Sequence, residues 1–208
     1  MRKIVRGNAP DILIEEQALT AGSKMPNWMV WRDEFKKKKE QNPSHTFSWK
    51  QFKNQKVNHH ILPDLEKMAD NHCHYCDDFP PVRGDQSIDH FKPKGNPAFY
   101  HLVYQWENLY QACKHCQDCK RELFEKNLIR PDAPNYSFER YFTFNFRTFE
   151  IEILPGLIGE DLDRAIASIR IFGFNQSGKP IRRRHALETY NAQQNPFLVD
   201  YPFRFLFE

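Results

Sequence analysis

The sequence predicts an α+β fold in which a metal-stapled core lies between a helical N-terminal part and a mixed α/β C-terminal extension. Three patterns indicate this division. Apolar residues recur at helical spacing early in the chain, two C-x2-C pairs lie in its middle, and alternating strand-like segments precede helical ones in its last part. We expect these parts to cover residues 1–71, 72–126 and 127–208 and to pack together as one compact domain.

The N-terminal part is predicted to be mostly helical. Trp28, Trp31 and Phe35 are spaced so that they share one helix face. We interpret this aromatic face as core packing, with stacking on nucleic acid as the less favoured alternative. A second helix is expected from about Ser48 through Lys56, and a third from about Pro63 to Asn71.

The core is predicted to run as strand, loop, strand and helix. Arg83-Gly84-Asp85 indicates a turn, and residues Gln86 to Phe91 have strand-like character. Proline and glycine at 93–97 break any regular element. Residues Tyr100 to Trp106 are expected to return as the second strand. A helix should then begin near 108–113 and continue to Leu123 or beyond.

The C-terminal extension is predicted to combine a hairpin with helices. Apolar and polar residues alternate over Tyr141 to Phe146 and again over Phe149 to Leu154, which is typical of paired strands. Apolar residues from Leu162 to Ile169 then fall at helical spacing, and Gly173 is expected to end that helix.

Two further features of the extension leave alternatives open. The basic cluster Arg182 to His185 opens another helical segment, and it is either a phosphate contact or a solvated helix end. The terminal segment Phe203 to Phe207 is apolar with period two. It is either tucked into the fold, which we favour, or offered to a partner as an added strand.

The bulk composition is that of a folded protein in a reducing compartment. The 208 residues are 40% hydrophobic and 14% aromatic, which provides enough apolar surface for a core. The net charge of +3 is too small to identify a polyanionic partner. Five cysteines in a chain of this length do not suggest a disulfide framework, and no run is long and apolar enough to cross a bilayer. We therefore expect a cytoplasmic protein.

Four of the five cysteines have the spacing of a structural zinc site. Cys73, Cys76, Cys113 and Cys116 form two pairs whose side chains can reach one tetrahedral ion. The alternative is four buried free cysteines. Asp89-His90 and Asn108 cannot belong to that saturated site. They suggest a second, open site where a carboxylate holds a hard cation and an imidazole activates water.

With these residues the chain resembles the HNH nucleases, whose ββα-metal core is often stapled by zinc. The matching motifs are, in chain order, Cys73-x2-Cys76, Asp89-His90, Asn108-Leu109, and Cys113-x2-Cys116 followed by Lys120. Softer similarities extend over most of the chain, among them Ser168-Ile169-Arg170 and Gly173-Phe174-Asn175. These resemble the HNH subunit of Septu-type antiphage systems, including those carried beside retrons.

The resemblance implies a role for each matched residue. Asp89 would ligate Mg²⁺ or Mn²⁺, His90 would take a proton from water, and Asn108 would brace the loop that orients His90. Directly after the second cysteine pair the family usually has His or Asn, and here Gln117 stands in that position. We predict that Gln117 is the second ligand of the catalytic cation, with Asp118 as the alternative.

Basic residues flank the proposed site and are candidates for contacts to substrate phosphate. They are Lys92, Lys94, Lys120 and Arg121. The alternative for each is an ordinary solvated charge.

The resemblance implies an endonuclease that hydrolyses phosphodiester bonds in DNA or transfer RNA as the effector of an antiphage system. It also implies control by an ATPase subunit and, in retron-linked systems, a reverse transcriptase with its RNA–DNA product. A second hypothesis is a zinc-knuckle nucleic-acid-binding or scaffold protein without catalysis. A third is a standalone restriction- or homing-type HNH nuclease.

Overall fold

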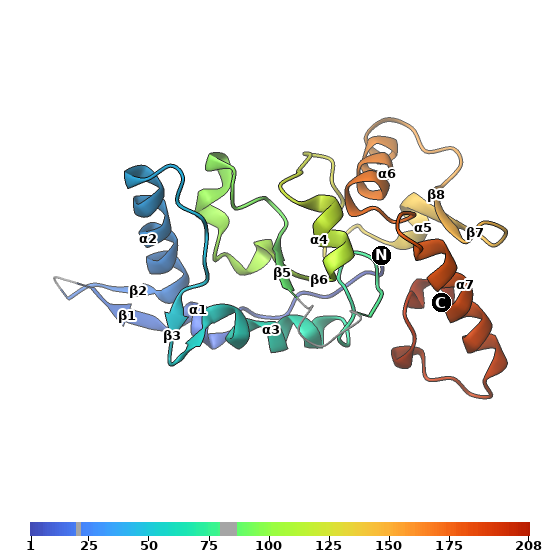
Figure 1. The fold of residues 1–208 in the computed structure, drawn as a ribbon, viewed down its shortest axis with the longest axis horizontal. Coiled ribbons are helices and arrows are strands. Elements are labelled where there is room, and N and C mark those ends of the chain that lie inside the picture. The colour runs from blue at the N-terminus through green and yellow to red at the C-terminus, as the bar shows by residue number, and fades with distance from the viewer. Residues whose placement is uncertain (20–21, 80–86) are drawn as a thin grey trace.

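The computed structural model describes residues 1–19, 22–79 and 87–208. Its elements are arranged along one long axis, with the N-terminal helices and hairpins at one end and the C-terminal helices at the other (Figure 1). The paired strands β5 (Ser87–His90) and β6 (Leu109–Ala112) lie between them (Figure 1). The fold is mixed α+β, as predicted, and its sheets among the described residues are four antiparallel pairs.

The described residues of the N-terminal part form three helices and two small hairpins. Its elements are α1 (Asp11–Ile14), β1 (Glu16–Ala18), β2 (Lys24–Pro26), α2 (Asn27–Gln41), β3 (Gln51–Phe52), β4 (Gln55–Lys56) and α3 (Val57–Met68). Trp31 and Phe35 are 3% and 5% exposed on the inner face of α2, which confirms the prediction of core packing for these two.

The helix predicted over Ser48–Lys56 is wrong. That segment ends in the hairpin β3–β4, whose two turn residues Lys53 and Asn54 both have positive φ, 46° and 65°. A two-residue hairpin turn with two left-handed residues matches the twist of the strands, and asparagine tolerates that conformation. The following helix, α3, was expected to begin near Pro63. It begins at Val57, and Pro63 lies inside it.

The middle of the chain pairs β5 with β6 in antiparallel register, with Asp89 opposite Tyr110 and His90 opposite Leu109. The second strand was expected at Tyr100–Trp106, and this is wrong. That stretch forms the 3₁₀ helix η1 (Pro97–Leu102), capped by the Asn96 side chain, and η2 (Trp106–Asn108) follows it. The helix after β6 is α4 (Lys114–Lys120), which is shorter than predicted. The predicted turn Arg83–Asp85 lies outside the described residues.

The β5–β6 pair separates two hydrophobic clusters. Phe91, Tyr110 and Ala112 belong to a cluster that contains the four paired cysteines and much of the C-terminal extension. Leu109 belongs to the other, with α2, α3 and η1, and Ile88 packs against it. This division follows from the geometry of a strand, in which successive side chains point to opposite faces.

The C-terminal extension contains the predicted hairpin and helices. Its elements are α5 (Phe138–Tyr141), β7 (Phe142–Asn145), β8 (Glu150–Ile153), α6 (Gly159–Phe172), α7 (Lys179–Ala192), η3 (Leu198–Asp200) and η4 (Arg204–Leu206). Gly173 ends α6 with φ 61°, as predicted, and a Cβ there would lie 2.5 Å from Cys119 Sγ, so only glycine fits without rearrangement.

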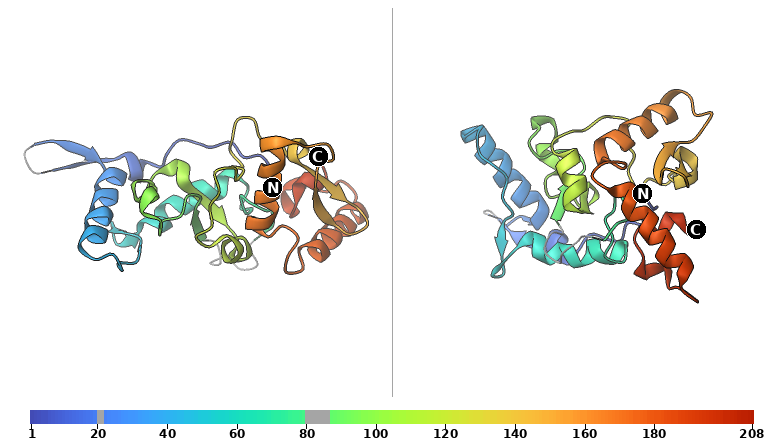
Figure 2. Two further views of the ribbon diagram at one scale, coloured as in Figure 1. Left: turned by 90° about the horizontal axis from the view of Figure 1, so that it is seen from above. Right: turned by 45° about the vertical axis from the view of Figure 1, so that its right-hand side comes forward.

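The carboxyl end is tucked into the fold, which was the favoured alternative. Phe203 is 0% exposed and Phe205 is 7% exposed, and the segment forms a 3₁₀ turn rather than a strand. The amino-terminal segment starts beside it, where Arg2 pairs with Glu208 at 2.7 Å, and then runs along the molecule to α1 (Figure 2). Among the described residues there is no helix with the length and apolar character needed to span a membrane.

Candidate metal centre and adjoining site

The four paired cysteines converge as the sequence predicts. Cys73 and Cys76 lie on the turn after α3, Cys113 follows β6, and Cys116 lies in the first turn of α4. All four are buried and free of disulfides, and their sulfurs lie within 4.8 Å of one another. A tetrahedral zinc ion with Zn–S bonds of about 2.3 Å requires sulfurs about 3.8 Å apart. Cys76 Sγ and Cys113 Sγ are 3.7 Å apart, so this cluster fits one zinc ion.

Asp89 faces the cysteine-containing cluster from the middle of β5. Its Oδ2 accepts a hydrogen bond from Tyr75 Oη at 2.8 Å and pairs with Lys120 Nζ at 3.0 Å. Burial raises the pKa of this carboxyl group, although the Lys120 ammonium and the Tyr75 hydroxyl oppose the shift. Asp89 is thus a buried carboxylate held by a cation and a hydroxyl.

His90 points to the opposite face, into the N-terminal cluster. Its Nε2 lies 2.9 Å from the carbonyl oxygen of Val103. A carbonyl can only accept, so Nε2 carries the hydrogen and Nδ1 keeps its lone pair. Nδ1 is buried and has no hydrogen-bond partner among the residues that the structure describes.

Two aromatic residues of the segment Asn42–Lys50 cover the His90 ring. Trp49 stacks on it with centroids 5.5 Å apart, and Phe47 meets it edge-on at 5.0 Å. Burial lowers the pKa of His90 to about 3, aided by the charges of Lys94 and Lys120, so the imidazole is neutral near pH 7.

Asn108 holds the loop that follows His90. Its Oδ1 accepts from Lys92 N at 2.8 Å, while its Nδ2 donates to the carbonyl oxygens of Lys92 at 3.1 Å and Leu102 at 3.2 Å. The residue is 5% exposed. A single side chain therefore ties the end of β5 to the start of β6.

The two candidates for a second cation ligand lie in different environments. Gln117 is partly buried in α4, and its Nε2 donates to the carbonyl oxygen of Ala112 at 2.8 Å. Asp118 lies at the surface and pairs with Lys114 at 3.1 Å. Apart from the four cysteines, no group of three or more Cys, His, Asp or Glu side chains within the described ranges is placed to hold a metal.

The four predicted phosphate contacts do not form one surface. Lys120 is 0% exposed and donates to the carbonyl oxygen of His90 at 2.7 Å as well as pairing with Asp89, so the alternative of a solvated surface charge is wrong for this residue. Arg121 is exposed, and its Nε donates to the Asp118 carbonyl oxygen at 2.9 Å. Lys92 and Lys94 are partly exposed on the loop after β5, and Lys94 is close enough to influence the pKa of both Asp89 and His90.

Two arginines of the basic cluster near the start of α7 make contacts within the fold, and one of them is buried. Arg182 pairs with Asp78 at 2.6 Å, and Arg183 is 1% exposed and donates to the carbonyl oxygens of Phe149 and Phe174. Arg182 and Arg184 are both exposed, and Arg184 lies 3.8 Å from Glu188 on the same helix.

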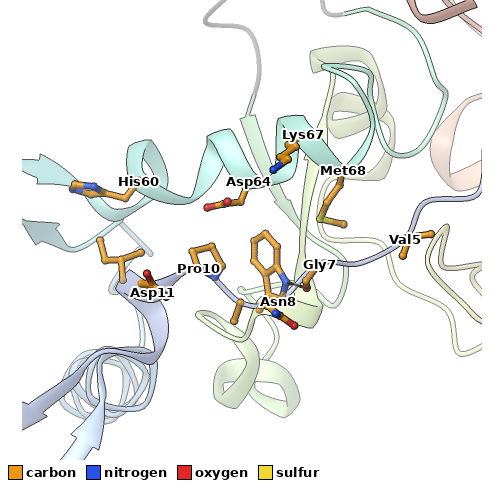
Figure 3. Close-up of a pocket in the computed structure, with 12 residues that line it drawn as sticks. Val5, Gly7, Asn8, Pro10, Asp11, His60, Asp64, Lys67 and Met68 are labelled. Carbon is orange, nitrogen blue, oxygen red and sulfur yellow. Dashed lines mark hydrogen bonds between the residues drawn. The ribbon is translucent and has the colours of Figure 1, made fainter.

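A groove of about 680 Å³ lies away from this site, between the amino-terminal segment and α3. Asp64 and Lys67 of α3 face Asn8 and Pro10 across it (Figure 3). Neither Asp89 nor His90 lines the groove, so it is not the place where their chemistry would occur.

No protein-family model matches the chain, and no curated protein is significantly similar to it in sequence. Its function is therefore inferred from the geometry of the side chains.

Proposed function

We propose that the chain is a metal-dependent HNH-type endonuclease that hydrolyses phosphodiester bonds in nucleic acid. The observation that carries this proposal is the state of His90. Its Nε2 is fixed by the Val103 carbonyl, and its Nδ1 carries no hydrogen and has no partner within residues 1–19, 22–79 and 87–208. This is the arrangement required of a general base, because one nitrogen is oriented and the other can receive a proton.

The surrounding elements supply what such a base needs. A strand, a second strand and a helix follow one another as β5, β6 and α4, and the Asn108 side chain closes the loop between the strands. When a water molecule gives its proton to Nδ1, the Val103 carbonyl stabilises the positive charge that develops on the ring. Asn108 keeps His90 in position during this transfer.

The predicted ligands Asp89 and Gln117 carry donor atoms that suit a hard cation. A carboxylate and the Gln117 amide oxygen are ligands that Mg²⁺ and Mn²⁺ accept, and Mg²⁺ normally keeps several waters besides one or two protein ligands. Such a cation would neutralise charge on the scissile phosphate. Asp89 and His90 point to opposite faces of β5 in this structure, so the proposal requires substrate binding to bring both side chains to one phosphate. Lys120 shares Asp89 Oδ2, whereas Oδ1 makes no hydrogen bond within the described parts of the chain. Lys92, Lys94 and the exposed Arg121 then remain as the proposed phosphate contacts.

The site in this structure is closed, because Trp49 and Phe47 cover His90. We infer that substrate or a partner displaces the segment Asn42–Lys50 before cleavage. A nuclease that is closed on its own agrees with control by an ATPase subunit of the Septu type in the cytoplasm, with a retron reverse transcriptase and its RNA–DNA product as a further partner. DNA and transfer RNA are both proposed substrates.

The test is cleavage by the zinc-loaded full chain, with and without its presumed ATPase partner. Plasmid DNA and total transfer RNA are incubated with Mg²⁺ or Mn²⁺ and either wild type, His90→Ala or the control His101→Ala, which changes an exposed histidine of η1. We expect His90→Ala to lose about 10²-fold or more of the rate, as removal of a general base does. His101→Ala should cut like wild type. Cutting without the partner would favour a standalone restriction-type nuclease.

The second candidate, a zinc-knuckle binding or scaffold protein, is favoured by the Lys120–Asp89 pair. A carboxylate with a purely structural role would pair with a buried ammonium, as the proposed metal ligand Asp89 does with Lys120. Binding of nucleic acid without cutting, unchanged by His90→Ala and by the partner, would establish this alternative. In an active enzyme, Gln117→Ala should be impaired more than Asp118→Ala, and the reverse would make Asp118 the ligand.

A further inference from the structure

The first residue of α7 places a buried ammonium against the cysteine cluster. Lys179 Nζ lies 3.4 Å from Cys76 Sγ, 4.0 Å from Cys113 Sγ and 2.7 Å from Asp78 Oδ2. The residue is 4% exposed, although it lies 103 positions from Cys76 in the sequence. Lysine has three N–H donors, and here three acceptors surround it.

Asp78 belongs to the same turn as the first cysteine pair. Its carbonyl oxygen accepts from Cys73 N at 3.0 Å, and its carboxylate is shared between Lys179 and Arg182. The neighbouring Asp77 pairs with Arg204 at 2.7 Å. Three cations of the C-terminal extension therefore meet the two carboxylates that follow Cys76.

The charges explain why this contact is more than packing. A zinc ion with four thiolates carries a net charge of about −2, and burying such a charge is costly unless it is compensated. An ammonium next to two of the sulfurs offsets part of that charge and donates to the thiolates. Groups that hydrogen-bond metal ligands typically contribute about 10–100-fold to metal affinity.

We propose that Lys179 offsets part of the negative charge of the zinc-loaded cysteine cluster and so couples zinc retention to the docking of α7. The proposal rests on the four-cysteine metal site, and it is independent of whether the chain cleaves nucleic acid. Coupling is reciprocal: if the α7 lysine strengthens zinc binding, zinc must strengthen the docking of α7 by the same free energy.

Zinc transfer from the full chain to a chromophoric chelator tests the first half. The variants are Lys179→Met, which keeps the aliphatic length, Lys179→Arg, which keeps the charge, and the control Arg184→Met on the exposed face of the same helix. We expect Lys179→Met to lower zinc affinity about 10–100-fold. Lys179→Arg should fall in between, because a guanidinium cannot direct three donors from one nitrogen. Arg184→Met should match wild type.

Cobalt substitution distinguishes direct donation to sulfur from a general loss of packing. Removing an N–H donor raises the energy of the thiolate lone pairs, so the sulfur-to-cobalt charge-transfer band should move to lower energy in Lys179→Met and less in Lys179→Arg. Unchanged zinc affinity and an unchanged band in Lys179→Met would overturn the proposal. If Lys179→Met does not fold, the uncharged Lys179→Gln takes its place, and wild-type affinity and band position in that variant would overturn the proposal.

Hydrogen exchange tests the second half. Chelation of zinc from the wild-type chain should raise amide exchange in α7 more than in α2, which packs in the other hydrophobic cluster. Exchange in α7 that is the same with and without zinc would show that its docking does not depend on the metal.

Discussion

Asn108→Ala should destabilise the protein by about 3 kcal/mol. The side chain makes three hydrogen bonds to backbone groups of Lys92 and Leu102, and it is 5% exposed. Each such bond contributes about 0.5–1.5 kcal/mol, and buried groups left without partners cost more. In a chain of this size, about 3 kcal/mol lowers Tm by roughly 6–12 °C.

Thermal unfolding in excess zinc measures this change, and Asn96→Ala is the control. Asn96 lies at the start of η1, where its exposed side chain accepts one bond from Ala98 N at 3.0 Å. That variant should lose about 1 kcal/mol. Equal losses in the two variants would refute the idea that Asn108 ties β5 to β6.

Asn108→Asp tests the same hydrogen bonds through the pH dependence of stability. The aspartate keeps the acceptor for Lys92 N, but as a carboxylate it faces two carbonyl oxygens that Nδ2 now contacts. Its pKa should rise in the folded state, so the variant should be destabilised at pH 7 and recover part of its stability as the pH falls through that raised pKa. An Asn108→Asp variant as stable as wild type at pH 7 would contradict the assigned bonds.

Three further outcomes are expected. Trp49→Ala should expose His90, so that diethyl pyrocarbonate modifies His90 several-fold faster than in wild type. The buried His72 should stay protected and serves as the internal control. An unchanged modification rate of His90 would mean that Trp49 does not shield it. Chelation of zinc should unfold the region that contains the four cysteines, seen as lost near-ultraviolet circular dichroism, and intact spectra would rule out a structural metal. Burial raises the pKa of Asp132, but bonds from Arg6, Tyr110 and Arg130 outweigh burial and lower it overall. Asp132→Asn should therefore cost about 2 kcal/mol at pH 7. The difference from wild type should shrink as the pH falls below about 4, because the unfolded carboxyl group is protonated there and the folded one is protonated at its lower pKa. A constant difference would refute the pairing.

Local signals in the sequence predicted those parts of the fold that local chemistry determines. The Gly173 helix end and the β7–β8 hairpin depend on residues close together in the chain, and both are found where expected. The pairing of two C-x2-C motifs was predictable because one ion needs four ligands. The strand β6 was misplaced because Tyr100–Trp106 has the apolar content of a strand, whereas Pro97 and the Asn96 cap start a 3₁₀ helix there.

Contacts between distant parts of the chain could not be predicted in the same way. The sequence around Lys120 predicts an exposed helix residue. Its burial depends on Asp89, which lies on a different element. Lys179 belongs to a segment that reads as a basic helix start, and its contact with Cys76 follows from the docking of the whole C-terminal extension. Trp49 gave no signal as a neighbour of His90, because a segment without regular structure brings it there.

The two faces of the β5–β6 pair place the two proposed catalytic residues in different surroundings. Asp89 points into the cluster that contains the cysteines and the C-terminal extension, where ion pairs and the metal site fix its surroundings. His90 points into the cluster of the N-terminal part, where its cover comes from Phe47 and Trp49 on the segment Asn42–Lys50. That segment can move without disturbing any of the four cysteines. We therefore expect a partner that activates the chain to act from the N-terminal side, because uncovering His90 there leaves Asp89 and the zinc-binding cysteines in place.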